Sequence, residues 1–517
     1  MIDNLKYWAR KRGDQIALNG PCVDGRIEIT WQELDLYSDR LAAYLAEKTQ
    51  NKRYPIIVYG HKSPWMIISF LACVKSGHTY CPVDSVMPHN RVMDIVAEID
   101  SPFVICVQSL ELMEPYEAIT LQCIESICKS EEAVDISQLM PIQDDETYYI
   151  LFTSGSSGKP KGVQISKSNV FHFVDWMMNI IKNDTRLGAD PTWEQPLRVM
   201  NQVPLSFDVS VMDTYIVLMT GGTWYALGKE EFGDYQVLYD ELAKSEADIW
   251  VSTPSFAEVC MADPIYNSEL MPNMRLFLFC GETFGNNTYE KLYKRFPEAE
   301  IYNTYGPTEA TVAVSEVKVT PELSEKYRPL PVGRAKPGIK FLIEKDGEFT
   351  DEENVKGEVI IAGDTVSRKG YLHRPDLTEK AFFKVNWKGE ELQAYRTADE
   401  GYLADGMLFY GGRLDFQIKL HGYRIELGDI ESNMSELPNV QRAVVLPTIR
   451  KGEVKSLKAY VQSSKKIEDE FAEAQNLRQQ LAKHIPEYMV PKRVIFVDQF
   501  PMNQNGKIDR RALEKIK

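Results

Sequence analysis

The 517-residue sequence lacks any long, uninterrupted apolar segment. Its longest strongly apolar run, around Trp65 to Val74, is about half as long as a bilayer-spanning helix must be. The first residues, Met1-Ile2-Asp3-Asn4, do not begin a basic-then-apolar signal sequence. We therefore expect a cytoplasmic, soluble protein without stable membrane insertion.

The eight cysteines follow no C-x-x-C spacing and have no neighbouring histidine cluster. This excludes the common zinc and redox motifs and predicts reduced, mostly buried thiols. Low-complexity tracts and internal repeats are also absent, which excludes a solenoid. At 517 residues the chain is too long for one ordinary core, so we expect two or more domains.

The sequence has no excess of positive charge. Its net charge of −16 argues against nucleic acid as the main partner. Residues 415–517, however, carry 18 Lys and Arg against 14 Asp and Glu, a net of +4, which leaves 41 against 61, a net of −20, for the rest. A basic C-terminal part suits an acidic partner, although compositional scatter would give the same difference.

The first half of the chain alternates between strand-like and helix-like segments. A capping box at Thr30-Trp31-Gln32-Glu33 begins an amphipathic helix that continues through Leu45. The other predicted segments are strands at 55–60, 80–84, 103–107, 249–251 and 276–279, and helices at 64–75, 91–99 and 170–181. This alternation favours a layered α/β body whose sheets are largely parallel.

Further along, the pattern changes to short strands and turns, which predicts a β-rich subdomain near 357–361 and 401–403. After Gly411-Gly412-Arg413 a compact pattern follows, with strands at 444–446 and 459–461 and a helix at 475–484. We therefore expect an α/β protein with a large N-terminal domain, residues 1–414, built of layered α/β subdomains and the β-rich subdomain. A small, mobile α+β domain, residues 415–517, completes the chain.

The segment from Tyr149 to Gly162 joins an apolar run to a loop of hydroxyl residues, glycines and lysines, YILFTSGSSGKPKG. It lacks the G-x-x-x-x-G-K-[ST] spacing of a Walker A loop. Glycines nevertheless let backbone N–H groups approach a phosphate chain, hydroxyls donate to it, and lysines add positive charge. A flexible surface linker is the alternative interpretation.

Four other segments have the same character. They are Asn303 to Glu309, Tyr395 to Asp399, Tyr410 to Asp415, and Asn505-Gly506-Lys507. They offer an acid for Mg²⁺, an acid for ribose hydroxyls, a guanidinium for sugar or phosphate, and a lysine on a glycine turn. Each alone is explained by ordinary turns or surface ion pairs, but independent turns would not produce this order and these residue types together.

Together these segments resemble the adenylate-forming superfamily of acyl-CoA synthetases, peptide-synthetase adenylation domains and luciferases. The resemblance runs from the first helical region to Lys507, and the Thr-Ser-Gly-Ser-x-Gly-x-Pro-Lys-Gly loop and the Tyr-Gly-Pro-Thr-Glu turn carry it. Segments such as Ser252 to Glu258 and Asp415 to Arg424 are more similar still to one branch. That branch activates D-alanine with ATP and loads it onto the phosphopantetheine thiol of a small acidic D-alanyl carrier protein, for D-alanylation of (lipo)teichoic acid.

The resemblance implies the residues that contact each ligand. For ATP they are Thr153, Ser154, Lys161, Asn303, Thr304, Tyr305, Gly306, Pro307, Thr308, Asp399, Tyr410, Gly411, Gly412, Arg413 and Lys507. For D-alanine they are Asp208, Cys280, Val312 and Lys507. Glu309 would hold Mg²⁺ and Asp208 the substrate amino group, while Lys507 would bridge the substrate carboxylate and the α-phosphate. Glu309 and Lys507 are thus the expected catalytic residues.

Two of these positions leave questions open. Cys280 would be a wall of the substrate pocket, but a merely buried cysteine fits equally well. The family usually has glycine before the ribose-binding acid, where this chain has Ala398. If that position requires a positive φ, alanine is strained by about 1 kcal/mol.

The expected reaction is attack of a carboxylate on the α-phosphate of ATP, followed by transfer of the acyl group to a carrier thiol. Two alternatives within enzymes are a stand-alone adenylation enzyme for another small amino acid and a coenzyme A ligase. Asp208 argues against a fatty acid, because its buried carboxylate would face an alkyl tail unpaired. A third alternative is an inactive nucleotide-binding scaffold, against which Glu309 and Lys507 both argue.

Overall fold

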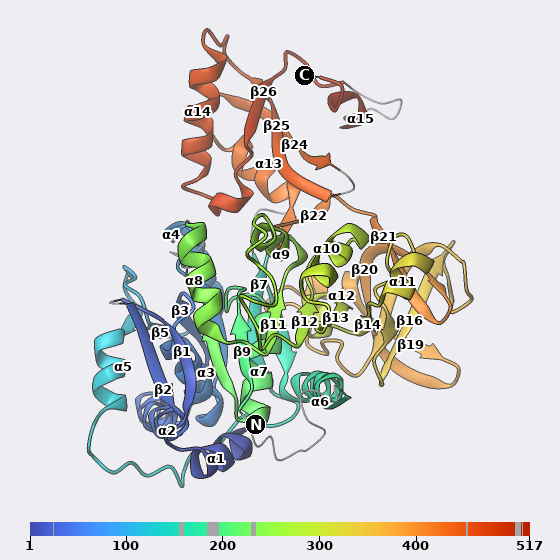
Figure 1. Ribbon diagram of the computed structural model, residues 1–517. Helices are drawn as coiled ribbons and strands as arrows, with labels where there is room; N and C mark the ends of the chain where they lie inside the picture. The colour runs from blue at the N-terminus through green and yellow to red at the C-terminus, as the bar shows by residue number, and fades with distance from the viewer. Residues whose placement is uncertain are drawn as a thin grey trace. The chain divides into compact units, whose positions relative to one another are not determined.

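The computed structural model of the chain describes residues 1–23, 25–154, 160–183, 196–228, 234–450, 453–501, 508 and 510–516. These residues divide into two compact units. The first unit comprises Met1–Ser85, Ile99–Leu151 and Gly162–Gly412, and the second comprises Val86–Glu98, Phe152–Lys161 and Arg413–Lys517. Figure 1 shows their helices and strands, coloured from the N-terminus to the C-terminus.

The largest sheet of the first unit contains nine strands of the described chain. Their spatial order is β15 (Arg334–Ala335), β14 (Ser315–Lys318), β13 (Glu300–Tyr305), β12 (Leu276–Phe279), β11 (Ile249–Ser252), β9 (Arg198–Asn201), β10 (Thr223–Ala226), β1 (Ile16–Cys22) and β2 (Gly25–Thr30). The six strands from β13 to β1 pair in parallel. All four residues of β11 and of β12 are buried, as expected for parallel strands covered on both faces.

A second, largely parallel sheet has six strands within the described residues. Their order is β6 (Glu117–Thr120), β5 (Phe103–Cys106), β3 (Pro55–Gly60), β4 (Thr79–Asp84), β7 (Thr147–Thr153) and β8 (Lys161–Ser166). Two helices, α3 (Pro64–Lys75) and α7 (Ser210–Thr220), are buried nearly all round. Since such a helix can only lie inside a layered body, these two form its central layer, with α7 packed on β9, β10 and β11.

The β-rich part of the first unit is an antiparallel sheet. Its order is β17 (Glu348–Thr350), β16 (Ile339–Lys345), β18 (Gly357–Gly363), β20 (Glu390–Ala404) and β19 (Phe382–Trp387), and β21 (Met407–Arg413) pairs with β20. The predicted short strand at 401–403 is the end of β20, which is 15 residues long. The register between β18 and β20 shifts at Val359, and this irregularity matters for the site described below.

The remaining helices of the first unit cover these sheets. They are α1 (Ile2–Lys11), α2 (Trp31–Lys48), α5 (Leu121–Cys128), α6 (Lys167–Asn183), α8 (Tyr235–Ser245), α9 (Pro254–Cys260), α10 (Asn286–Arg295), the 3-10 turn η2 (Thr308–Ala310), α11 (Pro321–Lys326) and α12 (Pro375–Ala381). The predicted capping box is present at α2, since Thr30 accepts from the Glu33 N–H and Glu33 accepts from the Thr30 N–H. The predicted strand at 276–279 and helix at 64–75 are confirmed at those bounds.

The C-terminal part of the second unit, orange to red in Figure 1, is a compact α+β structure. It contains the hairpin β22 (Gln417–Leu420) and β23 (Tyr423–Glu426) and the sheet of β24 (Val440–Arg450), β25 (Glu453–Ser463) and β26 (Arg493–Phe496). Its helices are α13 (Leu427–Ser435), α14 (Glu470–Leu481), the 3-10 turn η3 (Glu487–Met489) and α15 (Arg510–Leu513), and the unit also takes in most of α4 (His89–Ile99). Apolar residues of α13, β24, β25 and α14 form its core.

The predicted fold class is therefore confirmed: a large N-terminal α/β body with a β-rich part, and a C-terminal α+β part. No disulfide joins any of the eight cysteines, all of which lie within the described ranges, and six of them are buried, in keeping with the expectation of mostly buried thiols. No helix among the described ranges combines the length and the apolar character needed to cross a membrane.

Candidate functional site

The candidate residues of the first unit gather where parallel strands end. β12 ends at Phe279 and is followed by Cys280, while its neighbour β13 ends at Tyr305 and is followed by Gly306. Ligands of open α/β sheets bind at the carboxyl ends of the strands. The topology therefore brings the Cys280 segment and the Asn303–Thr308 segment to one edge of the sheet.

Two candidate side chains at the end of β13 bind neighbouring backbone. The Asn303 amide donates to the Pro331 carbonyl at 2.9 Å, and the Thr304 hydroxyl donates to the Phe279 carbonyl at 2.8 Å. Both side chains are buried. These bonds hold the turn that follows β13 against its neighbours.

The turn after β13 has an unusual backbone. Thr311 and Val312 both have positive φ, 64° and 66°, which costs a β-branched residue about 1–3 kcal/mol. A Cβ on Gly306 would lie 2.6 Å from the Ala313 Cα, so only glycine allows the close approach of the two arms of the turn. The turn is pinned from outside, because the Thr311 hydroxyl donates to the Thr365 carbonyl at 2.8 Å. Strain of this kind is typical of binding sites.

The turn joins the two proposed ligand subsites directly. Thr308 is expected near the α-phosphate, and Asp208 is expected to hold the substrate amino group. The Thr308 hydroxyl donates to Asp208 Oδ2 at 2.6 Å. Tyr149 lies within electrostatic reach of Asp208. Burial raises the pKa of Tyr149 well above its usual value, and the Asp208 charge raises it further.

The two other expected substrate residues also meet. The Cys280 thiol donates to the Val312 carbonyl at 3.9 Å, within the range for sulfur. Both residues are almost completely buried. Cys280 therefore supports the backbone of the strained turn, which fits either a pocket wall or a structural thiol.

The expected ribose acid, Asp399, lies on a β-bulge of β20. Glu358 pairs with Glu400 and Ile360 with Arg396, so Val359 alone faces the three residues 397–399. Bulges of this kind re-aim side chains next to sites. The Thr397 hydroxyl secures the bulge by donating to the Val359 carbonyl at 2.7 Å and accepting from the Asp399 N–H at 2.9 Å.

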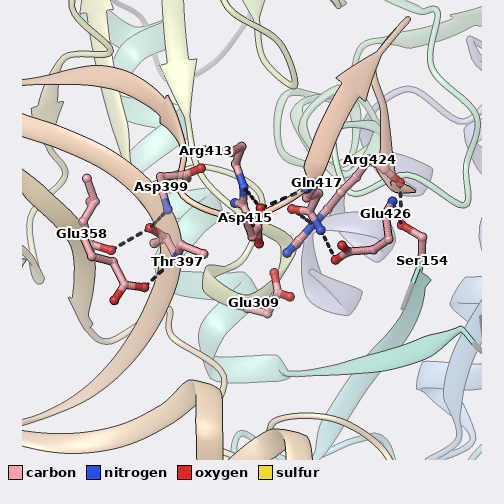
Figure 2. A network of polar contacts seen from close by, with 12 residues as sticks. Ser154, Glu309, Glu358, Thr397, Asp399, Arg413, Asp415, Gln417, Arg424 and Glu426 are labelled. Carbon is pink, nitrogen blue, oxygen red and sulfur yellow. Dashed lines mark hydrogen bonds and ion pairs between the residues drawn. The ribbon is translucent and has the colours of Figure 1, made fainter. Parts of the chain in front are cut away.

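Ala398 at the centre of this bulge has a φ of 55°. The position therefore does require the left-handed conformation for which the family usually has glycine, and the strain anticipated for alanine is present. The Ala398 N–H compensates by donating to Glu358 Oε1 at 2.9 Å. Figure 2 shows Glu358, Thr397 and Asp399 together at this bulge.

Tyr305 links the bulge to the turn. Its hydroxyl donates to Asp399 Oδ2 at 2.5 Å, and its ring lies 6.2 Å from the Tyr410 ring, centroid to centroid. Tyr410 belongs to β21, which pairs with β20. The structure thus brings together Asp208, Cys280, Thr308, Val312, Tyr305, Asp399 and Tyr410 through an unbroken series of contacts and backbone.

Glu309, the expected Mg²⁺ ligand, is completely buried. Its Oε1 accepts a hydrogen bond from the Tyr371 hydroxyl at 2.8 Å, and its carbonyl accepts from the Ser367 N–H at 2.9 Å. No cluster of three or more metal-ligating side chains occurs in the described part of the chain. A single oriented carboxylate fits Mg²⁺, which prefers one or two carboxylates and completes its shell with phosphate and water oxygens.

The second unit contains Thr153 and Ser154, the two hydroxyl residues that follow the apolar run of the Tyr149–Gly162 segment. The Thr153 Oγ1 is buried and has no hydrogen-bond partner among the residues described, as expected of a donor that awaits a ligand. The Ser154 hydroxyl, by contrast, donates to the Arg424 carbonyl at 2.8 Å and accepts from the Glu426 N–H at 3.2 Å (Figure 2). Lys161 begins β8 and acts electrostatically on Glu426, opposing the rise that burial causes in the pKa of that carboxyl.

Arg413 in the second unit forms a two-point ion pair with Asp415. Its Nε lies 2.9 Å from Oδ1 and its Nη2 lies 2.5 Å from Oδ2 of that carboxylate. Burial alone would raise the pKa of Asp415, but the hydrogen bond and charge of Arg413 outweigh it, and the pKa is lowered. Gly411 and Gly412 end the first unit, and Gly412 has a φ of 122°.

Some expected residues lie outside the described residues. They are Lys507 and the loop residues 155–159. Their proposed roles stay predictions from the sequence.

Sequence reasoning missed Tyr371, Thr397 and Tyr149 as members of the site. Tyr371 follows a glycine and precedes the Leu-His-Arg-Pro segment, a pattern that gives no sign of its distant partner Glu309. Thr397 lies within the Tyr395–Asp399 segment that the sequence analysis singled out. The position of Thr397 two residues before Asp399 was the only sequence signal that the two could form a hydrogen bond.

Comparison with known proteins identifies the class. A family model described as AMP-binding enzyme matches residues 5–372, and one described as AMP-binding enzyme C-terminal domain matches residues 429–507. The chain therefore belongs to the AMP-binding enzyme family.

Curated relatives named D-alanine–D-alanyl carrier protein ligase match this chain over nearly its whole length. The protein from Listeria welshimeri is 41% identical over 100% of this chain and 98% of its own length. The protein from Listeria innocua is 42% identical over 99% and 98%, and that from Bacillus licheniformis is 40% identical over 100% and 99%. Relatives over the whole chain are thus named ligases, which agrees with the predicted enzyme class.

Solved structures agree in fold. A nonribosomal peptide synthetase protein containing adenylation and PCP domains, bound to a vinylsulfonamide inhibitor, has a TM-score of 0.80 at 24% identity, covering 99% of this chain and 83% of that one. A Vibrio cholerae adenylation domain in complex with glycyl-adenosine-5'-phosphate has a TM-score of 0.79 at 21% identity, covering 99% and 96%. At these identities the likeness establishes the adenylate-forming fold alone.

Proposed function

We propose that this chain activates D-alanine with ATP to D-alanyl-adenylate and transfers the D-alanyl group to the phosphopantetheine thiol of a D-alanyl carrier protein. Relatives with that name match along the whole chain. The product would feed the D-alanylation of (lipo)teichoic acid, and the enzyme itself would act in the cytoplasm.

One observation carries this proposal beyond the family. Asp208, an acid able to hold an ammonium group, is hydrogen-bonded at 2.6 Å to Thr308 of the turn expected to cradle the α-phosphate. An amino-acid substrate needs both elements side by side, because its carboxylate must reach the α-phosphate while its amino group stays paired. A fatty-acid ligase has no use for Asp208, whose charge would face an alkyl tail.

The first step brings two anions together. An oxygen of the substrate carboxylate attacks the α-phosphorus and forms a bond to it. The bond between the α-phosphorus and the oxygen that bridges to the β-phosphate breaks, and pyrophosphate leaves. Glu309 would hold Mg²⁺, whose positive charge would offset this repulsion. Lys507 would add its ammonium between the carboxylate and the α-phosphate, while Thr153, Ser154 and Lys161 would orient the leaving group.

Nucleotide recognition would use an acid, an arginine and the turn that follows β13. Asp399 would accept hydrogen bonds from the ribose hydroxyls, held in place by the bulge and Tyr305. Arg413 would donate to the same sugar or its phosphate, with Gly411 and Gly412 alongside, and residues 303–307 would cradle the adenine.

The second step uses the same adenylate. The carrier thiol attacks the acyl carbon, a thioester forms and AMP leaves. We propose that a small domain, residues 415–517, rotates on a hinge near Asp415 between the two steps. Its net charge of +4 would favour the approach of an acidic carrier.

The decisive experiment is ATP–pyrophosphate exchange over a panel of acids, including D-alanine, L-alanine, glycine and a short fatty acid. We expect D-alanine to give the highest kcat/KM. In the variant Asp208→Asn we expect the KM for D-alanine to rise far more than that for ATP, because a buried charge pair that loses one partner costs about 2–5 kcal/mol. Preference for another acid, or equal changes in both KM values, would overturn this assignment.

A further inference from the structure

The hydrogen bond from Thr308 to Asp208 creates a conflict between the two subsites. A hydroxyl has one proton to donate. In the structure this proton is directed to Asp208 Oδ2 at 2.6 Å. While that bond lasts, the same hydroxyl cannot donate to a phosphate oxygen of the nucleotide.

The substrate amino group resolves the conflict. An ammonium group brings three donors and a positive charge, so it is a better partner for a carboxylate than a neutral hydroxyl. When it binds Asp208, the Thr308 proton is free to turn toward the α-phosphate. The exchange requires only rotation of the hydroxyl about one bond.

Backbone hydrogen bonds fix the turn around Thr308, so a change of partner requires rotation of the side-chain hydroxyl and not movement of the turn. The Thr308 carbonyl accepts from the Thr311 N–H at 3.1 Å, and the Pro307 carbonyl accepts from the Ala310 N–H at 2.9 Å. The next residue, Glu309, is tied through its carbonyl to the Ser367 N–H at 2.9 Å. With the turn fixed on both sides, the hydroxyl is the part that can change partner.

From this geometry we propose that Thr308 couples the amino-acid and nucleotide subsites, so that an amine bound at Asp208 tightens the binding of ATP, and ATP in turn tightens the binding of the amine. This inference rests on the proposed function, since it takes an amino acid as the substrate. The coupling is reciprocal by thermodynamic necessity. As a consequence, an acid that lacks an amino group does not tighten the binding of ATP. The protein therefore discriminates against such acids at the binding step, before the adenylate forms.

The test uses D-alaninol, which has the ammonium group of D-alanine but no carboxylate, so that no adenylate can form. The dissociation constant of Mg·ATP is measured by calorimetry with and without saturating D-alaninol. For wild-type protein we expect ATP to bind at least about 5-fold more tightly with the amine present, the lower end of ordinary coupling.

Two variants separate the hydroxyl from the charge. Thr308→Val keeps the shape of the side chain but removes the donor. We expect D-alaninol to tighten ATP binding to this variant by roughly 2-fold or less, compared with about 5-fold or more in wild type. The remainder reflects neutralisation of the Asp208 charge by the ammonium group, which needs no hydroxyl. Thr308→Ser retains the donor, and we expect it to keep most of the wild-type coupling.

The outcomes distinguish the coupling from the function. If wild type carries out D-alanine-dependent exchange, but Thr308→Val shows the same coupling as wild type, the role of Thr308 is overturned and the function stands. If wild-type protein binds no D-alaninol and exchanges no pyrophosphate with D-alanine, both are overturned. Loss of coupling in Thr308→Ser as well as in Thr308→Val would assign the effect to packing and would also overturn the proposal.

Discussion

At the scale of single residues, the described site depends on hydroxyl groups that hold carboxylates. Tyr371 donates to Glu309, Tyr305 donates to Asp399 and Thr308 donates to Asp208. Each carboxylate is thereby fixed in orientation before a ligand arrives. A preorganised acid spends no further free energy on ordering when it binds a cation or a sugar.

Tyr371→Phe should weaken the contact with Mg²⁺ without unfolding the protein. A hydrogen bond to a charged group contributes about 1.5–3 kcal/mol, so we expect the Mg·ATP dissociation constant to rise roughly tenfold or more while ATP binding in EDTA is unchanged. Calorimetric titrations with and without Mg²⁺ measure both.

Tyr266→Phe is the matched control, because the buried Tyr266 hydroxyl has no hydrogen-bond partner in the described residues. It should leave both constants as in wild type. An equal loss of affinity for ATP with and without Mg²⁺ in Tyr371→Phe would show that Tyr371 supports the nucleotide pocket as a whole.

At the scale of elements, the bulge in β20 is the feature that interrupts the regular pairing of this strand with β18. Three residues of β20 face one of β18, and the extra residues place Asp399 where Tyr305 reaches it. Thr397 closes the bulge on itself through two hydrogen bonds. The antiparallel sheet therefore sets the position of Asp399, the acid that we propose binds the ribose.

Thr397→Val should loosen this bulge selectively. The variant leaves the Val359 carbonyl and the Asp399 N–H without their partner, at a cost of about 1–3 kcal/mol. In exchange assays we expect the KM for ATP to rise about tenfold and that for D-alanine to change little. Thr397→Ser should restore the wild-type value, and a variant in which both KM values rise equally would count against a local role.

Glu316 on β14 carries a partly buried carboxyl that is hydrogen-bonded to Trp176 of α6. Glu316 has a buried Oε2 that lacks a hydrogen-bond partner among the described residues. Burial raises the pKa of Glu316 to about 7, opposed in part by a hydrogen bond with Trp176. This carboxyl therefore titrates near neutral pH, well above its usual range.

The sign of the resulting pH dependence follows from proton counting. Between about pH 4.5 and pH 7 the folded protein binds more protons at Glu316 than the unfolded chain, so its contribution to stability falls as pH rises. Glu316→Gln cannot titrate. Denaturant titrations at pH 5 and pH 8 should show the variant gaining about 1–3 kcal/mol relative to wild type at the higher pH. A constant difference between the two proteins at both pH values would contradict the assignment.

At the scale of the whole molecule, the proposed reaction divides its residues between two parts of the chain. Asp208, Thr308, Glu309 and Asp399 belong to the first unit, and Arg413 belongs to the second. With the residues divided in this way, a substitution in one unit can slow one half-reaction and leave the other unchanged. Lys507 offers the clearest case.

Lys507→Ala should nearly abolish pyrophosphate exchange while D-alanine still transfers from supplied D-alanyl-adenylate to the carrier. Adenylation needs a cation between two anions, whereas the thiol attacks an adenylate that already exists. Loss of several kcal/mol of transition-state stabilisation would slow exchange by a factor of about ten for every 1.4 kcal/mol. The rates of the two half-reactions are measured separately. Exchange at the wild-type rate would show that Lys507 is only a solvated lysine, and equal losses in both half-reactions would show that it supports the fold or holds the nucleotide.

The sequence predicted most elements because their signals are local. The capping box before Trp31, the buried run 276–279 and the helix at 64–75 each carry their own pattern of capping or burial. The partnerships of the site could not be predicted in the same way. Thr308 and Asp208 are 100 residues apart and Tyr371 and Glu309 are 62 apart, and only the arrangement of strands brings them together. The glycine that the family usually has at position 398 raises the question of a positive φ there without deciding it. Nothing in the sequence signals the positive φ at Thr311 and Val312, because neither residue type favours that conformation.

The order of strands in the nine-stranded sheet has a consequence for how the protein is made in the cell. β1 and β2 leave the ribosome first, yet the parallel neighbour of β1 is β10, in which Trp224 pairs with Leu18. The six-stranded sheet, complete by Ser166, can form in the meantime. At about 5–20 residues per second, the first hairpin waits on the order of 10–40 s for its partner. During that interval the apolar face of the hairpin, with Leu18 and Ile29, is exposed, and we expect chaperones to bind nascent chains at this early segment.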